Sequence, residues 1–145
     1  NMKRSAGIII VDTNSKPEPT VLAVRAYAHW DFPKGIIEEG ESDAEAAIRE
    51  TSEEVSLHPL LDYNMVEKGP VVYRGKGKNL KEVTYYLATR CSTNEPFLPV
   101  SEELGKPEND EFGWIRLGKL SHKFRNKELV KVVIPYIQTW CKKNL

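Results

Sequence analysis

Apolar positions along the chain fall into short runs that predict β-strands. The first run extends from Ala6 to Val11 within residues 3–12, and its β-branched character is typical of a strand buried on both faces. Further strands are predicted over residues 20–25, 63–73, 81–90 and 112–117. The polar, proline-containing residues 13–19 predict a hairpin loop after the first strand, and the Gly- and Lys-rich residues 74–79 predict another turn.

Two segments carry a helical pattern instead. A helix is predicted from Ser42 to Ser56, because Ser42 is followed three residues later by Glu45 in a capping-box signature. A second helix is predicted over residues 126–143, with an apolar stripe of Leu129, Val132, Val133, Tyr136, Ile137 and Trp140. Loops are expected over residues 30–41, with a short extended piece, and 95–110. This order of elements predicts one mixed α/β (α+β) layer fold.

Composition is that of an ordinary globular chain. With 145 residues, 40% hydrophobic and 29% charged, it predicts a single domain over residues 1–145. No apolar run approaches the roughly 20 residues that span a bilayer, and the first residues lack a signal-peptide stretch. The two cysteines fit free thiols in a reducing compartment. We therefore expect a cytoplasmic monomer without a membrane partner.

The charges are balanced in total but segregated along the chain. Twenty-one Lys and Arg match 21 Asp and Glu, and this zero total taken alone argues against bulk-charge binding to nucleic acid. However, residues 38–54 hold eight acids and one base, residues 68–90 six bases and one acid, and residues 116–145 eight bases and one acid. The acidic block of residues 38–54 is typical of a metal site, and the basic block of residues 68–90 could bind a polyphosphate. The basic block of residues 116–145 fits either the solvated face of a helix or a contact with RNA.

The acidic block concentrates carboxylates on one face of the first predicted helix. At about 100° per residue, Glu50, Glu53 and Glu54 share an arc of roughly 100°. Like charges at this spacing destabilise a helix, so a partner that offsets the repulsion is expected. Two interpretations are open: a solvated acidic face, or a site for a hard cation such as Mg²⁺ or Mn²⁺, which takes oxygen ligands.

The spacing of residues 35–57 resembles the Nudix box. The positions that match are Gly35, Glu41, Arg49, Glu50, Glu53, Glu54 and Leu57. Thr51 replaces an apolar residue and Ser56 replaces a glycine after the helix, and neither change removes a carboxylate. The resemblance implies a Nudix hydrolase with a mixed β-sheet sandwiched between helices. Members hydrolyse a nucleoside diphosphate linked to another group, using divalent cations.

The same resemblance implies roles for the box residues. Glu53 and Glu54 are expected to ligate Mg²⁺ or Mn²⁺, and Glu50 is expected to ligate the metal or act as general base. Arg49 is expected to orient a box carboxylate through an ion pair, and the carbonyl of Gly35 is expected to be a further ligand. An acidic residue outside the box is also expected, with Glu103 favoured among Glu102, Glu103, Glu108, Asp110 and Glu111.

Two short patterns narrow the expected substrate. The Trp-x-x-Pro-Lys-Gly sequence of residues 30–35 and the Lys-x-Val-x-Tyr-x-Leu sequence of residues 81–87 resemble the asymmetrical diadenosine tetraphosphate (bis(5'-nucleosyl)-tetraphosphate) hydrolases. These enzymes release ATP and AMP. Phosphate contacts are expected from Lys34 and Lys81, with Arg74, Lys76 and Lys78 adding charge, and base contacts from His29, Trp30, Phe32, Tyr85 or Tyr86. Because strand neighbours face opposite sides, only one of the two tyrosines is expected to face the cleft.

Alternative functions use the same box. RNA 5'-pyrophosphohydrolysis or decapping fits a similar lead sequence and the basic C-terminal block, so RNA is the alternative partner to a small dinucleoside polyphosphate. Hydrolysis of nucleoside triphosphates or inositol pyrophosphates is a further alternative. A non-catalytic nucleotide sensor is disfavoured, because Glu50, Glu53 and Glu54 are all retained.

Overall fold

The computed structural model describes residues 2–145, which form a seven-stranded sheet with helices on its faces. The strands are β1 (Lys3–Asp12), β2 (Thr20–Ala26), β3 (His29–Asp31), β4 (Lys34–Ile36), β5 (Tyr63–Arg74), β6 (Lys81–Arg90) and β7 (Glu111–Arg116). The helices are α1 (Asp43–Val55), α2 (Leu120–Lys123) and α3 (Ile134–Asn144), with 3₁₀ turns η1 (Gly77–Asn79) and η2 (Leu117–Lys119) and a π-helical turn η3 (Leu129–Val133). Among these residues, no helix combines the length and the apolar character needed to cross a bilayer.

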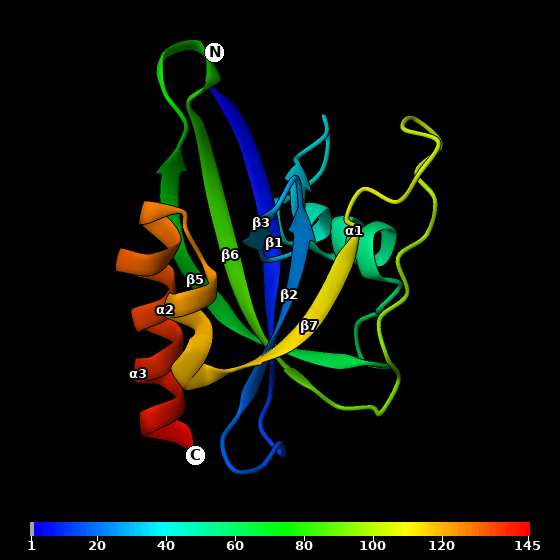
Figure 1. The fold of residues 1–145 in the computed structure, drawn as a ribbon. Helices are drawn as coiled ribbons and strands as arrows, with labels where there is room; N and C mark the ends of the chain where they lie inside the picture. Colours follow the sequence, from blue (N-terminus) through cyan, green and yellow to red (C-terminus); the bar gives the residue numbers. More distant parts are fainter. Residues whose placement is uncertain (1) are drawn as a thin grey trace.

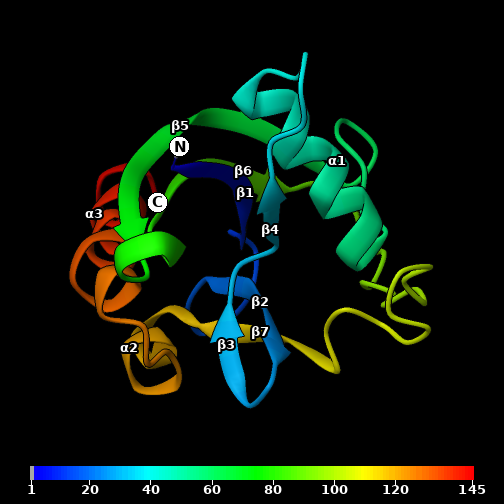
Figure 2. The ribbon, with the colours of Figure 1, turned by 90° about the horizontal axis from the view of Figure 1, so that it is seen from above.

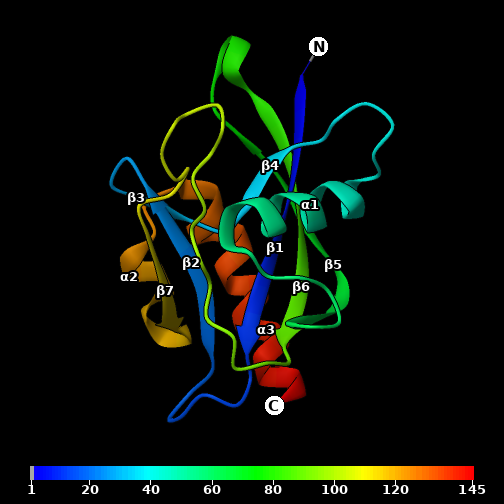
Figure 3. The ribbon, with the colours of Figure 1, turned by 90° about the vertical axis from the view of Figure 1, so that its right-hand side faces the viewer.

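The sheet is mixed, as the sequence predicts. Its strand order is β3-β2-β1-β6-β5, with β4 also paired to β1 and β7 to β2. The β1–β6 pair is parallel and the other pairs are antiparallel. Helix α1 lies against one side of the sheet and α2 with α3 against the other (Figures 1 and 3), while the sheet itself curves strongly (Figure 2). The predicted sheet between helices is therefore confirmed.

The central strand β1 is buried on both faces, which explains its continuous apolar run. Ile9 and Val11 belong to the core cluster beneath α3, whereas Ile8 and Ile10 belong to the cluster beneath α1. This alternation follows the two-residue period of a strand. Burial on both faces fixes the position of α1, and hence of the box, relative to the sheet.

Helix α1 begins and ends close to the predicted residues. The Ser42 hydroxyl accepts from Glu45 N at 3.1 Å and the Glu45 carboxylate accepts from Ser42 N at 2.9 Å, which completes the capping box. The helix ends at Ser56, whose φ of 58° is left-handed and whose N–H donates to the Ser52 carbonyl. A residue other than glycine pays roughly 1–2 kcal/mol in this conformation. Serine thus takes the backbone shape of the glycine that it replaces.

The C-terminal helix differs from its prediction. Pro135 has no N–H to donate to the carbonyl one turn earlier, so the regular hydrogen-bond ladder is interrupted here. The turn η3 before it is π-helical. Val132, expected on the apolar stripe, is 39% exposed, while Ile134 is buried. The wider turn therefore changes which side chains face the sheet.

Strand β4 and most of β3 lie within residues 30–41, which were predicted as a loop with a short extended piece. Strand β4 pairs with β1, with Gly7 opposite Lys34, and Ile8 N donates to the Pro33 carbonyl at 3.2 Å. A Cβ at position 7 would overlap both the Pro33 carbonyl and the Lys34 side chain. This close approach holds the residues that lead into the box directly on the central strand.

Candidate active site

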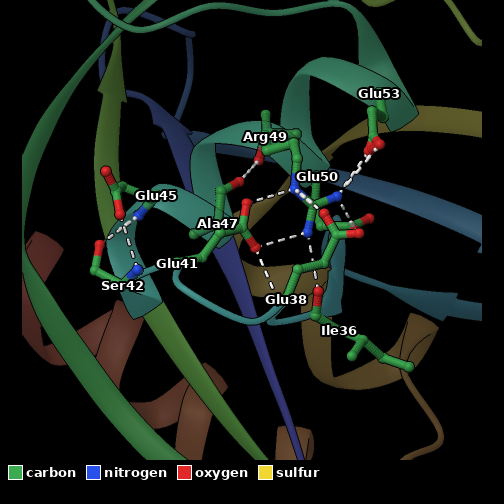
Figure 4. A network of polar contacts seen from close by, with 10 residues as sticks. Ile36, Glu38, Glu41, Ser42, Glu45, Ala47, Arg49, Glu50 and Glu53 are labelled. Atoms are coloured by element: carbon green, nitrogen blue, oxygen red, sulfur yellow. Dashed lines mark hydrogen bonds and ion pairs between the residues drawn. The ribbon is translucent and has the colours of Figure 1, made fainter.

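Arg49 of α1 lies at the centre of a carboxylate network (Figure 4). Its Nε donates to Glu41 at 2.6 Å, and its Nη1 donates to Glu50 at 2.9 Å and to Glu53 at 2.8 Å. Its Nη2 donates to the Ile36 carbonyl at 2.9 Å, which ties the helix to the segment before it. The ion pair that was expected to orient box carboxylates is therefore present.

These contacts keep the network charged. The hydrogen bond to Glu41 is the main cause that raises the pKa of Arg49, and the same hydrogen bond lowers the pKa of Glu41. Arg49 and Glu41 therefore carry opposite charges at neutral pH. The guanidinium offsets the repulsion that the sequence predicts between carboxylates on one helix face.

Three carboxylates converge beside this network. Glu50 and Glu54 of α1 and Glu108 of the loop before β7 offer oxygens within 4.8 Å of one another. Glu54 is only 5% exposed; Asn109 Nδ2 donates to its Oε1 at 3.1 Å, and its Oε2 is buried without a hydrogen-bond partner. Burial, followed by the charges of Glu108 and Glu50, raises the pKa of Glu54 well above its ordinary value. Burial and then Glu50 raise the pKa of Glu108 as well.

This cluster fits a hard divalent cation. A buried carboxylate oxygen without a partner is costly, and so is the approach of three like charges. Mg²⁺ and Mn²⁺ take carboxylate oxygens as ligands. An ion here would satisfy the second oxygen of Glu54 and offset its repulsion from Glu50 and Glu108. These three residues are the ones that could hold the expected metal.

Gly35 shapes the cluster through its lack of a side chain. A Cβ at position 35 would overlap the carboxyl group of Glu50, so this carboxylate lies directly over the glycine backbone. A larger residue would push Glu50 away from Glu54 and Glu108.

Gly35→Ala is therefore expected to lower kcat about tenfold, because it displaces a carboxylate of the cluster. The fold should persist, since the obstructing atoms belong to the end of a flexible side chain. Steady-state rates over a Mg²⁺ titration, together with circular dichroism, would measure both effects. An unchanged rate and an unchanged Mg²⁺ requirement would contradict this placement of Glu50.

A cationic group forms another part of the site. Arg74 Nη1 lies 2.8 Å from Asp31 Oδ2 and donates to the Tyr85 hydroxyl at 2.7 Å. Lys34 Nζ lies 3.7 Å from the same Asp31 oxygen. Repulsion from Lys34 is the main cause that lowers the pKa of Lys81, followed by burial and Arg74. Lys34 and Arg74 thus share one carboxylate with Lys81 close by, and the surplus positive charge suits phosphate.

One pocket of about 640 Å³, a size that suits a nucleotide, joins members of both groups, whereas Glu50 and the expected Lys81 are not among the residues that line it. Charged and polar lining comes from Asp31, Lys34, Glu54, Arg74, Glu108, Asn109, Arg125 and Asn126. The β2–β3 hairpin contributes Tyr27, His29 and Trp30. Lys123 Nζ lies 5.2 Å from the centre of the Trp30 ring, so a lysine of the basic C-terminal block lies beside the pocket.

Some expected residues lie apart from the pocket. Glu53 pairs with Arg49 and is 53% exposed, outside the group of three carboxylates. Tyr85 and Tyr86 face opposite sides of the sheet, as expected, but Tyr85 is buried in the core and Tyr86 packs beneath α1. Phe32 is also buried in the core, although it lines the pocket. Neither tyrosine is among the residues that line the pocket. Tyr85 reaches the site only through its hydroxyl.

The carboxylate outside the box that the structure places beside Glu50 and Glu54 is that of Glu108, whereas the sequence favoured Glu103. Glu103 lies in an exposed turn, whereas Glu108 directly precedes Asn109, which is anchored on Glu54. Asp110 N also donates to the Arg25 carbonyl at 2.8 Å, so this end of the loop is fixed. Closeness to the next predicted strand would favour Asp110 and Glu111, so no sequence signal singles out Glu108. No sequence signal marks Asn109.

Comparison with known proteins identifies the family of this chain. The family model of the NUDIX domain matches residues 2–135. An RNA pyrophosphohydrolase of Psychrobacter cryohalolentis is 30% identical over 135 residues, covering 83% of this chain and 76% of that protein. An asymmetrical bis(5'-nucleosyl)-tetraphosphatase of Caenorhabditis elegans is 34% identical over 88 residues, which are 59% of this chain and 63% of that protein.

Solved structures show the same fold. The crystal structure of a C. elegans Ap4A hydrolase binary complex has a TM-score of 0.83 and 21% identity, covering 98% of this chain and 99% of that chain. The NUDIX domain of Shewanella oneidensis NrtR, complexed with ADP ribose, has a TM-score of 0.73 and 15% identity, covering 97% of this chain and 88% of that chain. Because the NUDIX domain model spans nearly all of the residues that build this sheet and its carboxylate helix, the chain belongs to the NUDIX family.

Proposed function

We propose that this protein hydrolyses diadenosine tetraphosphate to ATP and AMP in a reaction that requires Mg²⁺. The observation that carries the proposal is a single pocket that joins carboxylates, cations and aromatic rings, represented by Glu54, Arg74 and Trp30. A dinucleoside polyphosphate needs oxygens to hold its counter-cation, cations for its phosphates and flat surfaces for its bases. The resemblance to the asymmetrical tetraphosphatase of C. elegans supports this choice.

The side chains divide the work of the reaction. Lys34 and Arg74 hold phosphate oxygens and align the chain of phosphates. Glu50, Glu54 and Glu108 would hold Mg²⁺, which when bound would neutralise phosphate charge and lower the pKa of water. A carboxylate of this group takes one proton from a water molecule while the oxygen of that water bonds to phosphorus. The bridging P–O bond breaks at the same time, which gives ATP and AMP. Arg49 is a positioning residue that keeps Glu50 in place.

RNA 5'-pyrophosphohydrolysis is a second candidate. Arg125 lines the pocket. Four exposed lysines lie near it in the chain and form no ion pair within residues 2–145, namely Lys119, Lys123, Lys127 and Lys131. An RNA backbone that leaves the pocket would meet this strip, and its binding would weaken steeply with salt. The similarity to the Psychrobacter RNA pyrophosphohydrolase favours this alternative.

A substrate panel separates the two candidates. With Mg²⁺ present, the protein should hydrolyse diadenosine tetraphosphate to ATP and AMP at least about tenfold faster than it hydrolyses 5'-triphosphorylated RNA, capped RNA or dNTPs. Chromatography of the products measures this, and EDTA should stop the reaction. Release of two ADP molecules would contradict the proposed point of attack. Faster pyrophosphate release from RNA would establish the second candidate instead.

A further inference from the structure

A carboxylate lies among the cations of the pocket. Asp31, the last residue of β3, lines the pocket together with Lys34 and Arg74. Because a carboxylate repels phosphate, a site that only had to bind phosphate tightly would not place one here. The acid also lies outside the group of three converging carboxylates. Its place in the pocket therefore calls for a role of its own.

Hydrogen bonds hold this carboxylate in one orientation. Its Oδ1 accepts from the backbone N–H of Phe32 at 2.7 Å and from the Tyr85 hydroxyl at 3.4 Å. Its Oδ2 lies 2.8 Å from Arg74 Nη1 and 3.7 Å from Lys34 Nζ. Since the backbone and a core tyrosine fix the first oxygen, the second oxygen is a fixed contact point for two cations.

The two cations depend on this oxygen to stay close together. Both side chains are mostly buried, so water screens their mutual repulsion only weakly. Within residues 2–145, neither Lys34 nor Arg74 pairs with any other carboxylate. The crowding extends to Lys81, because repulsion from Lys34 is the main cause that lowers the pKa of Lys81. Asp31 thus offsets a repulsion that would otherwise move the cations apart.

We propose that Asp31 is a positioning residue that keeps Lys34 and Arg74 aligned for the reacting phosphates and limits how tightly the pocket binds phosphate. This role rests on the proposed function, because it assumes that these two cations hold phosphate oxygens. Alignment before the substrate binds favours the transition state, since the cations then need no rearrangement during the reaction. Tighter binding of the substrate itself would not raise kcat. An acid in a phosphate pocket therefore serves the rate rather than the affinity.

Asp31→Asn tests both parts of this role, because it keeps the shape of the side chain and removes its charge. Binding of inorganic pyrophosphate, titrated calorimetrically with Mg²⁺, should become about fivefold tighter than in the wild type. In contrast, kcat for diadenosine tetraphosphate should fall about tenfold, since the cations are no longer aligned. Loss of structure alone would weaken the binding together with the rate, so the opposite directions of the two effects identify a positioning role.

Asp31→Glu separates the charge from its placement. Glutamate keeps the negative charge but extends it by one methylene group, so it cannot hold the same contacts with Arg74 and Lys34. Pyrophosphate binding should therefore stay within about twofold of wild type. The value of kcat should again fall about tenfold. Pyrophosphate binding that is as tight in Asp31→Glu as in Asp31→Asn would contradict the assigned effect of the charge.

Asp12→Asn is the matched control. Asp12, the last residue of β1, lies outside the pocket and 3.1 Å from Arg90, and the two side chains are 16% and 13% exposed. The side chains of Asp31 and Arg74 are 21% and 13% exposed, so the two pairs are similarly buried. Both asparagine variants should therefore lower Tm by a similar amount. Pyrophosphate affinity and kcat should both be unchanged in Asp12→Asn.

The outcomes separate the role of Asp31 from the proposed substrate. Weaker pyrophosphate binding in Asp31→Asn, or an unchanged kcat, would overturn the role of this residue. Equal effects of Asp12→Asn and Asp31→Asn on affinity and rate would overturn it as well. A wild type that fails to hydrolyse diadenosine tetraphosphate would refute the proposed substrate. Tighter pyrophosphate binding in Asp31→Asn would then still support the effect of this carboxylate on phosphate affinity.

Discussion

Glu54→Gln should lower kcat for diadenosine tetraphosphate about a thousandfold, a loss of about 4 kcal/mol in transition-state stabilisation. Glu54 is the most buried carboxylate of the cluster, and its second oxygen lacks a partner without a cation. Glutamine keeps its shape and the bond from Asn109, but it is a weak ligand for Mg²⁺. Steady-state assays over a Mg²⁺ titration measure the loss.

The same substitution should stabilise the metal-free fold at neutral pH. Burial and two neighbouring carboxylates raise the folded-state pKa of Glu54, so its ionised form opposes folding above that pKa. The gain in Tm from Glu54→Gln should therefore shrink as the pH falls toward about 4, the ordinary range for glutamate. Thermal unfolding in EDTA at several pH values checks this.

Glu39→Gln is the matched control for both effects, because Glu39 is an exposed glutamate of the same acidic segment. It should leave kcat and Tm close to wild type. Near-normal turnover by Glu54→Gln would contradict the assignment of Glu54 as a ligand of Mg²⁺. A lower Tm in EDTA for this variant would refute the electrostatic account of its burial.

Arg49→Gln should both slow catalysis, by about 10- to 100-fold, and destabilise the fold by about 2–3 kcal/mol. The substitution removes the cation that pairs with Glu38, Glu41, Glu50 and Glu53. These carboxylates would then repel one another, and Glu50 would lose the bond that orients it. Kinetics and urea unfolding measure the two losses.

Arg4→Gln provides the comparison. Arg4 also bridges two carboxylates, those of Asp43 and Glu82, but its side chain is 52% exposed. Its loss should cost only about 0–1 kcal/mol and leave kcat unchanged. Arg49→Lys should recover part of the stability of Arg49→Gln but little of its rate, because lysine cannot bind several carboxylates in a fixed fork. Equal losses for Arg4→Gln and Arg49→Gln would show that Arg49 has no special role.

Local signals in the sequence were sufficient for most of the scaffold. The run from Ala6 to Val11 predicted the central strand, and the pair Ser42 and Glu45 predicted the start of α1. The helical angles of Glu50 and Glu54 placed their carboxylates together, and the spacing to Gly35 identified the family before any coordinates. Each of these features depends on residues that are close in the chain.

Features that depend on distant contacts were not accessible in the same way. Glu108 joins the cluster because Asn109 bonds to a helix 55 residues earlier in the chain. Tyr85 looked like a base contact, but the T-shaped packing of Phe32 on its ring places it in the core. Periodicity predicted that Tyr85 and Tyr86 would face opposite sides of the sheet, but it could not predict that neither ring lines the pocket.

The direct contact of strand β4 with Gly7 extends the site to a residue that no motif includes. Position 7 is in the middle of the hydrophobic core strand, yet a methyl group there would meet Lys34 and the Pro33 carbonyl rather than a core side chain. In a survey of natural or laboratory variants, Gly7→Ala would be classified as a conservative change in the core. We expect it to act instead through Lys34, the lysine proposed to bind phosphate, so the proposed activity would depend on one missing methyl group 28 residues before the box.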